Sequence, residues 1–297
     1  MSVVLMYHGV FPDNDKSTID AEDHPYAVSL SNFTHQLDLL AEHNVGLYGN
    51  GQVPDVVISF DDGHASNLSL AAPLLLERNL AAYFFITTNF IDRRLNFLSS
   101  DELAELSRLP GFCVGSHGMT HRFFDDMSVE ESNKELTESR QRLESICGSA
   151  CRSISFPGGR FGVQTHKQLV NVGYKQWFGS QTGLISPGRL TNEASCDGAV
   201  QVVSDRKSAS VRERHDKRST EFSDLPDRWS LMSQCDAAPL DRVAIRHNTQ
   251  MPEFRRITSQ EPAYFRRKRL NSQAKRIARR VIGNRLYHGL YRSLAVR

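Results

Sequence analysis

Short apolar runs that alternate with amphipathic segments constrain the fold of this chain more than any other feature of its sequence. The runs are residues 3–6, 56–60, 81–86, 112–114 and 154–156. Continuous apolar runs of this length are typical of strands that are covered on both faces, as in parallel sheets. We therefore predict an α/β fold in which helices cover a parallel sheet.

The segments between these runs carry helix signals. Ser99 and Glu102 have the spacing of a capping box, and Ser128 and Glu131 repeat it. Gly148 is expected to end the second of these helices. An earlier helix is predicted from an apolar stripe at helical spacing, formed by Phe33, Leu37, Leu40 and Ala41.

Composition divides the chain into four parts. Residues 1–186 hold the alternating pattern and are interpreted as the main part of the α/β domain. Residues 187–240 are polar and mixed in charge, which predicts an insertion or a disordered loop. An apolar run returns in residues 241–262, which we expect to form a final strand and loop. Residues 263–297 contain many basic residues and no acidic residue, and they predict a basic amphipathic helical tail.

The overall charge and the chain ends suggest a location. A net charge of +2 favours no particular partner, and the five cysteines are expected to be reduced. The N-terminus lacks the basic start of a signal peptide, and no apolar stretch is long enough for a membrane span. We therefore expect the protein in the cytoplasm or on the inner face of a membrane. Residues 266–297 are expected to pack against the rest of the protein or, as the alternative, to contact anionic lipid, whereas no nucleic-acid motif accompanies them.

Two carboxylates directly follow the second apolar run. Asp61 and Asp62 come after residues 56–60 and precede Gly63, where the chain must turn. The carboxyl ends of parallel strands form the active face of α/β barrels. Adjacent carboxylates repel each other there unless they share a cation or a proton. The pair therefore indicates either a metal site or an ordinary turn before a glycine.

Two histidines follow the fourth apolar run. His117 and His121 are four residues apart, a spacing that places two imidazoles on one face of a helical turn. Gly118 between them argues against a regular helix. With one aspartate, the pair would leave a divalent ion with open positions, as catalytic zinc sites require. The second aspartate is then a candidate general base, and a histidine is the candidate acid near neutral pH.

Three motifs occur together in an order that resembles a known family. They are ISFDDG at 58–63, SHGMTH at 116–121 and SFPGGR at 155–160. The combination resembles the polysaccharide deacetylases, carbohydrate esterase family 4 with a NodB homology domain, over residues 1–185. The resemblance implies a distorted (β/α) barrel of seven strands. It also implies a metal-dependent hydrolase that removes N-acetyl groups from a polysaccharide or a glycan precursor.

The resemblance implies roles for four residues. Asp61 would be the catalytic base, and Asp62, His117 and His121 would bind the metal. We expect this metal to be Zn²⁺, with Co²⁺, Mn²⁺ or Ni²⁺ as alternatives. The expected partner is an N-acetylated glycan substrate.

Two histidines compete for the role of general acid. His8 follows Met6-Tyr7, which is similar to the start of family members whose motifs are permuted. His247 follows residues 243–246 and resembles the usual late motif of the family, although Arg246 precedes it. We favour His8 and keep His247 as the alternative.

The third motif departs from the family pattern. The family commonly has an arginine that orients the base and a tyrosine at the oxyanion site, whereas Pro157 and Gly158 stand there in this chain. The Gly158 N–H is expected to donate to an oxyanion, with Pro157 and Arg160 beside it at the substrate. Arg152 or Arg160 is expected to replace the missing arginine. His64 takes the place of a frequent aromatic residue and is interpreted as a groove residue and not as a ligand.

Two alternatives to a polysaccharide deacetylase follow from these departures. The chain could be a catalytically impaired pseudoenzyme that binds a glycan or a membrane. The same machinery could also remove an acyl group from a small non-sugar amide.

Overall fold

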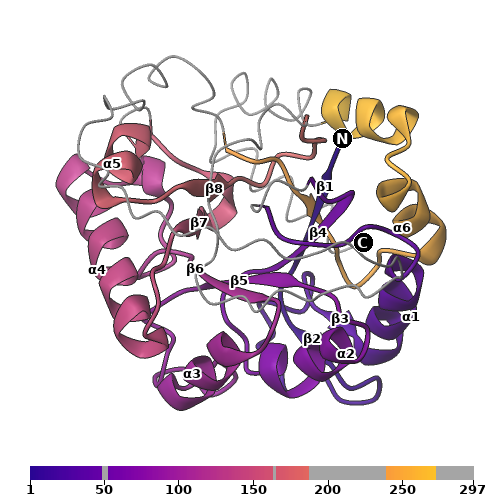
Figure 1. The fold of residues 1–297 in the computed structure, drawn as a ribbon, viewed down its shortest axis with the longest axis horizontal. Helices are drawn as coiled ribbons and strands as arrows, with labels where there is room; N and C mark the ends of the chain where they lie inside the picture. The colour runs from indigo at the N-terminus through magenta and orange to yellow at the C-terminus, as the bar shows by residue number, and fades with distance from the viewer. Residues whose placement is uncertain (49–52, 163–164, 187–238, 272–297) are drawn as a thin grey trace, which may run out of the picture.

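A computed structural model of the chain shows a curled parallel sheet with helices on its outer side (Figure 1). The structure describes residues 1–48, 53–162, 165–186 and 239–271. The curled sheet and its outer helices are those of a distorted (β/α) barrel, and the predicted fold class is confirmed.

Seven strands form the sheet, in the order β8-β7-β6-β5-β4-β1-β9. All of their pairings are parallel. The strands are β1 Val3–Tyr7, β4 Val56–Phe60, β5 Ala82–Ile86, β6 Phe112–Ser116, β7 Ser153–Ser155, β8 Gln176–Phe178 and β9 Val243–Ala244. A separate two-stranded sheet pairs β2 Val10–Phe11 with β3 Val28–Ser29. The five predicted apolar runs are therefore all strands of the main sheet.

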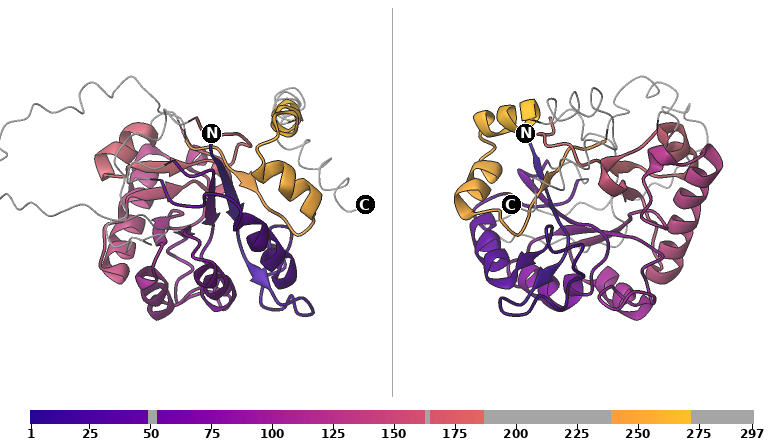
Figure 2. Two further views of the ribbon diagram at one scale, coloured as in Figure 1. Left: turned by 45° about the vertical axis from the view of Figure 1, so that its right-hand side comes forward. Right: turned by 180° about the vertical axis from the view of Figure 1, so that it is seen from behind.

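The helices lie outside the sheet, as the two further views show (Figure 2). They are α1 Leu30–Leu40, α2 Ala72–Glu77, α3 Ser100–Arg108, α4 Val129–Cys147, α5 Thr165–Val172 and α6 Met251–Thr258. Both predicted capping boxes are present, at Ser99 and at Ser128. Gly148 ends α4 with a φ of 67°, which is the left-handed cap that glycine favours. These local predictions are confirmed.

The strand register gathers the ends of neighbouring strands at one place. Tyr7 of β1 lies beside Phe60 of β4, and Phe60 lies beside Phe84 of β5. In the next pair of strands, Ile86 of β5 lies beside Ser116 of β6. The residues that directly follow these ends are therefore neighbours in space although they are far apart in sequence. This placement positions the candidate site.

The last strand returns to the first one. β9 pairs with β1 through Leu5 with Val243 and Met6 with Ala244. The prediction of a final strand in residues 241–262 is confirmed by this pairing. Arg242, the residue before β9, is consequently brought to the inside of the sheet, where it is fully buried.

Some sequence predictions lie outside the described residues. Nearly all of the polar segment 187–240 and the apolar stripe predicted within 272–297 belong to this part of the chain. The beginning of the tail is described: residues 262–271 are helical, and Tyr264 and Phe265 are buried. Among the helices of the described residues, none is long and apolar enough to cross a membrane.

The prediction that all cysteines are reduced is wrong, as Cys113 shows. Cys113 is disulfide-bonded, whereas Cys147 and Cys151 are free thiols. Cysteine spacing along the chain does not reveal which thiols the fold brings together, so this bond could not be predicted from the sequence.

Candidate active site

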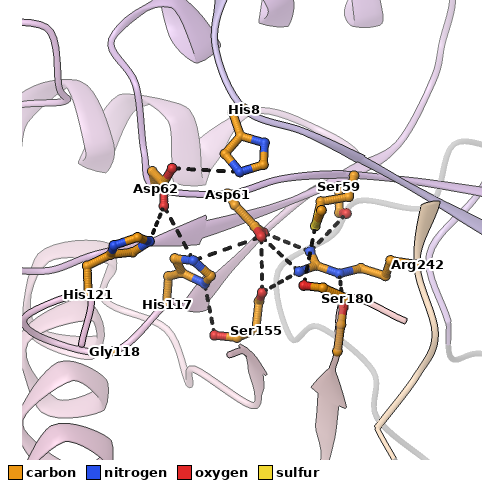
Figure 3. A network of polar contacts seen from close by, with 12 residues as sticks. His8, Ser59, Asp61, Asp62, His117, Gly118, His121, Ser155, Ser180 and Arg242 are labelled. Carbon is orange, nitrogen blue, oxygen red and sulfur yellow. Dashed lines mark hydrogen bonds and ion pairs between the residues drawn. The ribbon is translucent and has the colours of Figure 1, made fainter. Parts of the chain in front are cut away.

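Histidine and aspartate side chains meet where four parallel strands end (Figure 3). His8 follows β1, Asp61 and Asp62 follow β4, and His117 follows β6. The last residue of β7, Ser155, completes the group. The curled sheet therefore converts separate sequence motifs into one cluster.

Asp62 lies between two imidazoles. Its Oδ1 is 3.3 Å from Nε2 of His117 and 3.2 Å from Nε2 of His121. Ligand atoms of these three residues all lie within 4.8 Å of one another. The structure thus brings together the three residues for which the sequence implied a metal-binding role.

The orientation of His117 suits a metal ligand. Its Nδ1 lies 2.9 Å from the carbonyl oxygen of Ser155, an acceptor that fixes the proton on Nδ1. The Nε2 lone pair is then free and faces Asp62. Burial lowers the pKa of His117 to about 4, because the imidazolium form is poorly solvated there. His117 is therefore neutral near pH 7, which is the form that binds metals.

The segment from His117 to His121 is a loop and not a helical turn. Gly118 has a φ of 80° and His121 a φ of 63°, both in the left-handed region. The expectation that Gly118 argues against a regular helix is confirmed, and the two imidazoles still converge, with ring centroids 5.2 Å apart. Non-glycine residues rarely adopt such angles, and they gather at functional sites when the surroundings enforce them.

Glu135 of α4 enforces this loop. Its buried carboxylate accepts hydrogen bonds from the backbone N–H groups of Met119 at 2.5 Å and Thr120 at 3.0 Å. A Cβ at Gly118 would lie 3.2 Å from Oε2 of Glu135, and the positive φ would strain it further. Glu135 thus holds the loop that carries His121. Sequence reasoning missed this role, because nothing in the helical pattern of α4 marks an acidic residue as buried.

Asp61 is held by an arginine that the sequence analysis did not consider. Nη1 and Nη2 of Arg242 donate to Oδ1 and Oδ2 of Asp61 at 2.7 and 2.8 Å. Neither Arg152 nor Arg160 takes this position, so the expectation that one of them replaces the missing family arginine is wrong. Tertiary pairing of β9 with β1 supplies Arg242, and a local motif could not reveal it.

Arg242 is in turn fixed by three further acceptors. Its Nε donates to the carbonyl oxygen of Gly179 at 2.7 Å, and Nη2 also donates to Oγ of Ser155 at 2.7 Å. Nη1 lies 3.4 Å from Oγ of Ser59. A planar guanidinium with a full set of acceptors has one orientation, so it fixes both oxygens of Asp61.

Opposing effects set the charges of the two aspartates. Burial would raise the pKa of Asp61, but Arg242 and then His117 outweigh it, and the pKa lies below its ordinary value. Burial would likewise raise the pKa of Asp62, but the contact with His121 and the charges of the imidazoles hold that pKa well below its usual range. Both carboxylates are therefore ionised near neutral pH.

The structure separates the two candidates for the general acid. Nε2 of His8 lies 3.9 Å from Oδ2 of Asp62, and its ring is tilted against Tyr26 with centroids 4.9 Å apart. His247 is exposed, and its Nδ1 lies 3.1 Å from the carbonyl oxygen of Pro25. His8 belongs to the cluster and His247 does not.

The third motif forms a turn directly after β7. Pro157 is buried and Gly158 is exposed, with a φ of 61°. Arg160 is bound to Asp125 at 2.9 Å and to Asp126 at 2.7 Å, both outside the aspartate and histidine cluster. The oxyanion and substrate roles of Pro157, Gly158 and Arg160 stay predictions.

His64 is not a groove residue. It is fully buried, and its ring stacks on Phe97 with centroids 4.4 Å apart. The interpretation from sequence is wrong because the turn after Asp62 directs the chain inward and not along the surface. Ligand atoms of His64, Asp23 and Asp62 lie within 4.8 Å of one another, so a second cluster adjoins the first.

The sequence profile of the family described as "Polysaccharide deacetylase" matches residues 48–177. This segment contains the aspartate pair, the histidine pair and the turn after β7. Over residues 48–177 the chain resembles the polysaccharide deacetylase family. Its members are hydrolases, and the resemblance noted in the three motifs is confirmed.

Individual polysaccharide deacetylases are similar to the chain at low sequence identity. YxkH of Bacillus subtilis (strain 168), a polysaccharide deacetylase by name, is 23% identical over 185 residues, which are 62% of this chain and 66% of YxkH. The chain thus spans just under two thirds of that relative. The structure of BC0361, a polysaccharide deacetylase from Bacillus cereus, has a TM-score of 0.60 at 20% identity, with 86% of this chain and 68% of that chain covered.

A third similar structure is the Streptococcus pyogenes deacetylase PplD in complex with acetate. Its TM-score is 0.56 at 20% identity, with 63% of this chain and 87% of that chain covered. At such identities the two structures support the fold.

The cluster fits the divalent metal ion that the family leads one to expect. Oδ1 of Asp62 is buried and has no hydrogen-bond partner among the described residues, although two imidazole nitrogens face it. A buried carboxylate oxygen without a donor is costly unless a cation compensates it. Two imidazoles and one carboxylate form a donor set of a catalytic zinc site, which leaves positions open.

Proposed function

We propose that the chain is a metal-dependent N-deacetylase that releases acetate from N-acetylated sugar units of a polysaccharide or a glycan precursor. The observation that carries the proposal is the clamped carboxylate of Asp61 beside the group of Asp62, His117 and His121. The match of residues 48–177 to the polysaccharide deacetylase family supports the reaction class.

Asp62, His117 and His121 would hold the ion. We propose Zn²⁺, with Co²⁺, Mn²⁺ or Ni²⁺ as alternatives, because imidazole and carboxylate donors suit these ions. A divalent ion in this place polarises a carbonyl oxygen and lowers the pKa of water from about 15.7 towards 7.

Asp61 would act as the general base. It is ionised, because Arg242 and His117 keep its pKa low, and Arg242 fixes its orientation. It would take a proton from the attacking water as the water oxygen bonds to the acyl carbon. Proton transfer by a positioned group contributes roughly 10²- to 10⁴-fold in rate.

His8 would act as the general acid. The amide nitrogen is a poor leaving group unless it is protonated as the carbon–nitrogen bond breaks. His8 faces Oδ2 of Asp62, whereas Arg242 and Asp61 form a separate contact beside His117. Acid and base therefore occupy different places around Asp62, as proton donation and proton removal in one reaction require. The products are acetate and a free amine on the sugar.

An acetate-release assay tests the proposal. Metal-loaded protein is incubated with N-acetylglucosamine oligomers and, separately, with small non-sugar acetamides. We expect acetate from the oligomers, and loss of release in Asp61→Asn but not in Asp38→Asn, an exposed aspartate that pairs with Arg78 on the outer side. Release from the small amides alone would identify a small-amide deacylase. Metal binding without release from any acetylated sugar or amide would indicate the pseudoenzyme.

A further inference from the structure

His64 has an environment that a purely structural histidine would not tolerate well. The residue is fully buried against Phe97, and both ring nitrogens lack a hydrogen-bond partner among the described residues. A neutral imidazole has one donor and one acceptor, and buried polar groups of this kind are normally satisfied. The unpaired nitrogens therefore indicate that a ligand other than a protein atom binds His64.

Two carboxylates face this imidazole. Nε2 of His64 is 3.7 Å from Oδ2 of Asp23, too long for a hydrogen bond, and ligand atoms of His64, Asp23 and Asp62 all lie within 4.8 Å of one another. The side chain of Asp23 is 19% exposed and that of Asp62 is 7% exposed. Two largely buried carboxylates at such a separation require a shared cation or a shared proton.

The neighbouring arginine is engaged with other acids. Arg94 is bound to Asp20 and to Glu22, and its guanidinium stacks over Phe90 and Phe97 at 4.4 and 4.3 Å. Its charge also acts on Asp23, but its hydrogen bonds go to Asp20 and Glu22 and not to Asp23 or Asp62.

The two oxygens of the Asp62 carboxylate face different neighbours. Oδ1 faces His117 and His121, whereas Oδ2 points to the side of His8. We propose that His64, Asp23 and Asp62 hold a second divalent cation, and that Asp62 bridges it to the first. A bridging carboxylate is compatible with the separation of about 3.5–4 Å that two-metal hydrolase sites show.

One imidazole and two carboxylates define the class of ion. This donor set has no thiolate, so it suits Zn²⁺ or Mn²⁺ and not a soft ion. The inference rests on the proposed function, because the first site also uses Asp62. A second cation explains why His64 is a histidine. Any aromatic ring could stack on Phe97, whereas a cation also requires a ring nitrogen as its ligand.

Metal stoichiometry tests the second site directly. The full-length protein and its variants are dialysed against Zn²⁺ or Mn²⁺, and bound metal is measured by elemental analysis. We expect two ions in the wild type and one in His64→Phe, which keeps the stacked ring. Asp23→Asn, on a partly exposed loop, should also bind one ion, and the control His35→Phe, an exposed histidine of α1, should bind two.

The electron paramagnetic resonance spectrum of the Mn²⁺ form gives a second readout. Two ions bridged by Asp62 should give a spin-coupled spectrum, which His64→Phe and Asp23→Asn replace by the signal of isolated Mn²⁺. One ion per wild-type chain, lost only in His117→Ala, would overturn the second site and leave the proposed function intact. Two ions in both His64→Phe and Asp23→Asn would overturn it as well. No bound metal in the wild type would contradict both proposals.

Discussion

Arg242 and Asp61 form a two-point ion pair in the interior of the sheet, although 181 residues separate them in the sequence. The guanidinium is fully buried, and the carboxylate residue is only 2% exposed. Both charges are almost completely shielded from bulk water, so each depends on the other for its solvation. The pair therefore joins β4 to the segment before β9 and fixes the candidate base at the same time.

Arg242→Met should destabilise the protein strongly. Removing one partner of a buried ion pair costs about 3–5 kcal/mol, because the remaining charge is left without compensation. Denaturant unfolding of the metal-free protein measures this loss. The matched control is Arg160→Met, whose partly exposed pair with Asp125 should contribute less than about 1 kcal/mol. Similar losses of unfolding free energy in the two variants would show that the buried pair contributes no more to stability than the partly exposed pair.

Asp61→Asn should bind metal normally and lose most turnover. The amide cannot accept a proton from water, and the general base contributes roughly 10²- to 10⁴-fold. Bound metal per chain and the rate of acetate release are measured on the same preparation. Unchanged turnover with retained metal would exclude Asp61 as the base.

His8→Ala should slow hydrolysis of the amide more than that of an activated acetyl ester. The ester's leaving group departs without a proton, so it does not need the general acid. The rates of both substrates are compared with those of His247→Ala, which should leave both unchanged because His247 lies outside the cluster. A selective loss in His247→Ala would transfer the acid role to that residue.

Metal binding should release protons mainly from His121. Burial would lower the pKa of His121, but contact with Asp62 outweighs it and raises the pKa above the ordinary value. The pKa of His117 is lowered to about 4, so this residue is already neutral at pH 7. Because this pKa is raised, a proton competes with the metal for His121 at low pH. The competition disappears as the pH rises through that pKa.

Isothermal titration calorimetry in two buffers of different ionisation enthalpy measures this proton release. Below pH 7, where water on the ion keeps its protons, the number of protons released per ion should fall as the pH rises through the pKa of His121, and it should be smaller in His121→Ala. Release that persists unchanged in this variant would assign the titrating group elsewhere.

Glu135→Gln should weaken metal binding without abolishing it. The carboxylate holds the loop between Gly118 and His121, and residues that orient metal ligands typically contribute 10- to 100-fold in affinity. Metal affinity is compared with that of Glu138→Gln, an exposed glutamate of the same helix that pairs with Lys134. Equal affinities in the two variants would show that the loop holds its shape without Glu135.

Local sequence patterns determined the elements of this fold. Continuous apolar runs predicted the strands because a parallel sheet covered by helices excludes water from both faces. The capping boxes at Ser99 and Ser128 marked helix starts because these bonds involve residues three apart in the chain. Asp61, Asp62, His117 and His121 were equally visible, since each motif follows a strand and parallel strands end at one edge.

The tertiary structure alone decided which partners these residues have. Arg242 reaches Asp61 only because β9 crosses back to pair with β1, and no local spacing encodes that pairing. Glu135 supports the loop that carries His121, and His64 is buried beside Asp23. Both contacts likewise join segments that no local spacing links. Burial and long-range charge pairing depend on where distant segments pack, so the sequence determined the candidate groups and the fold determined their environment.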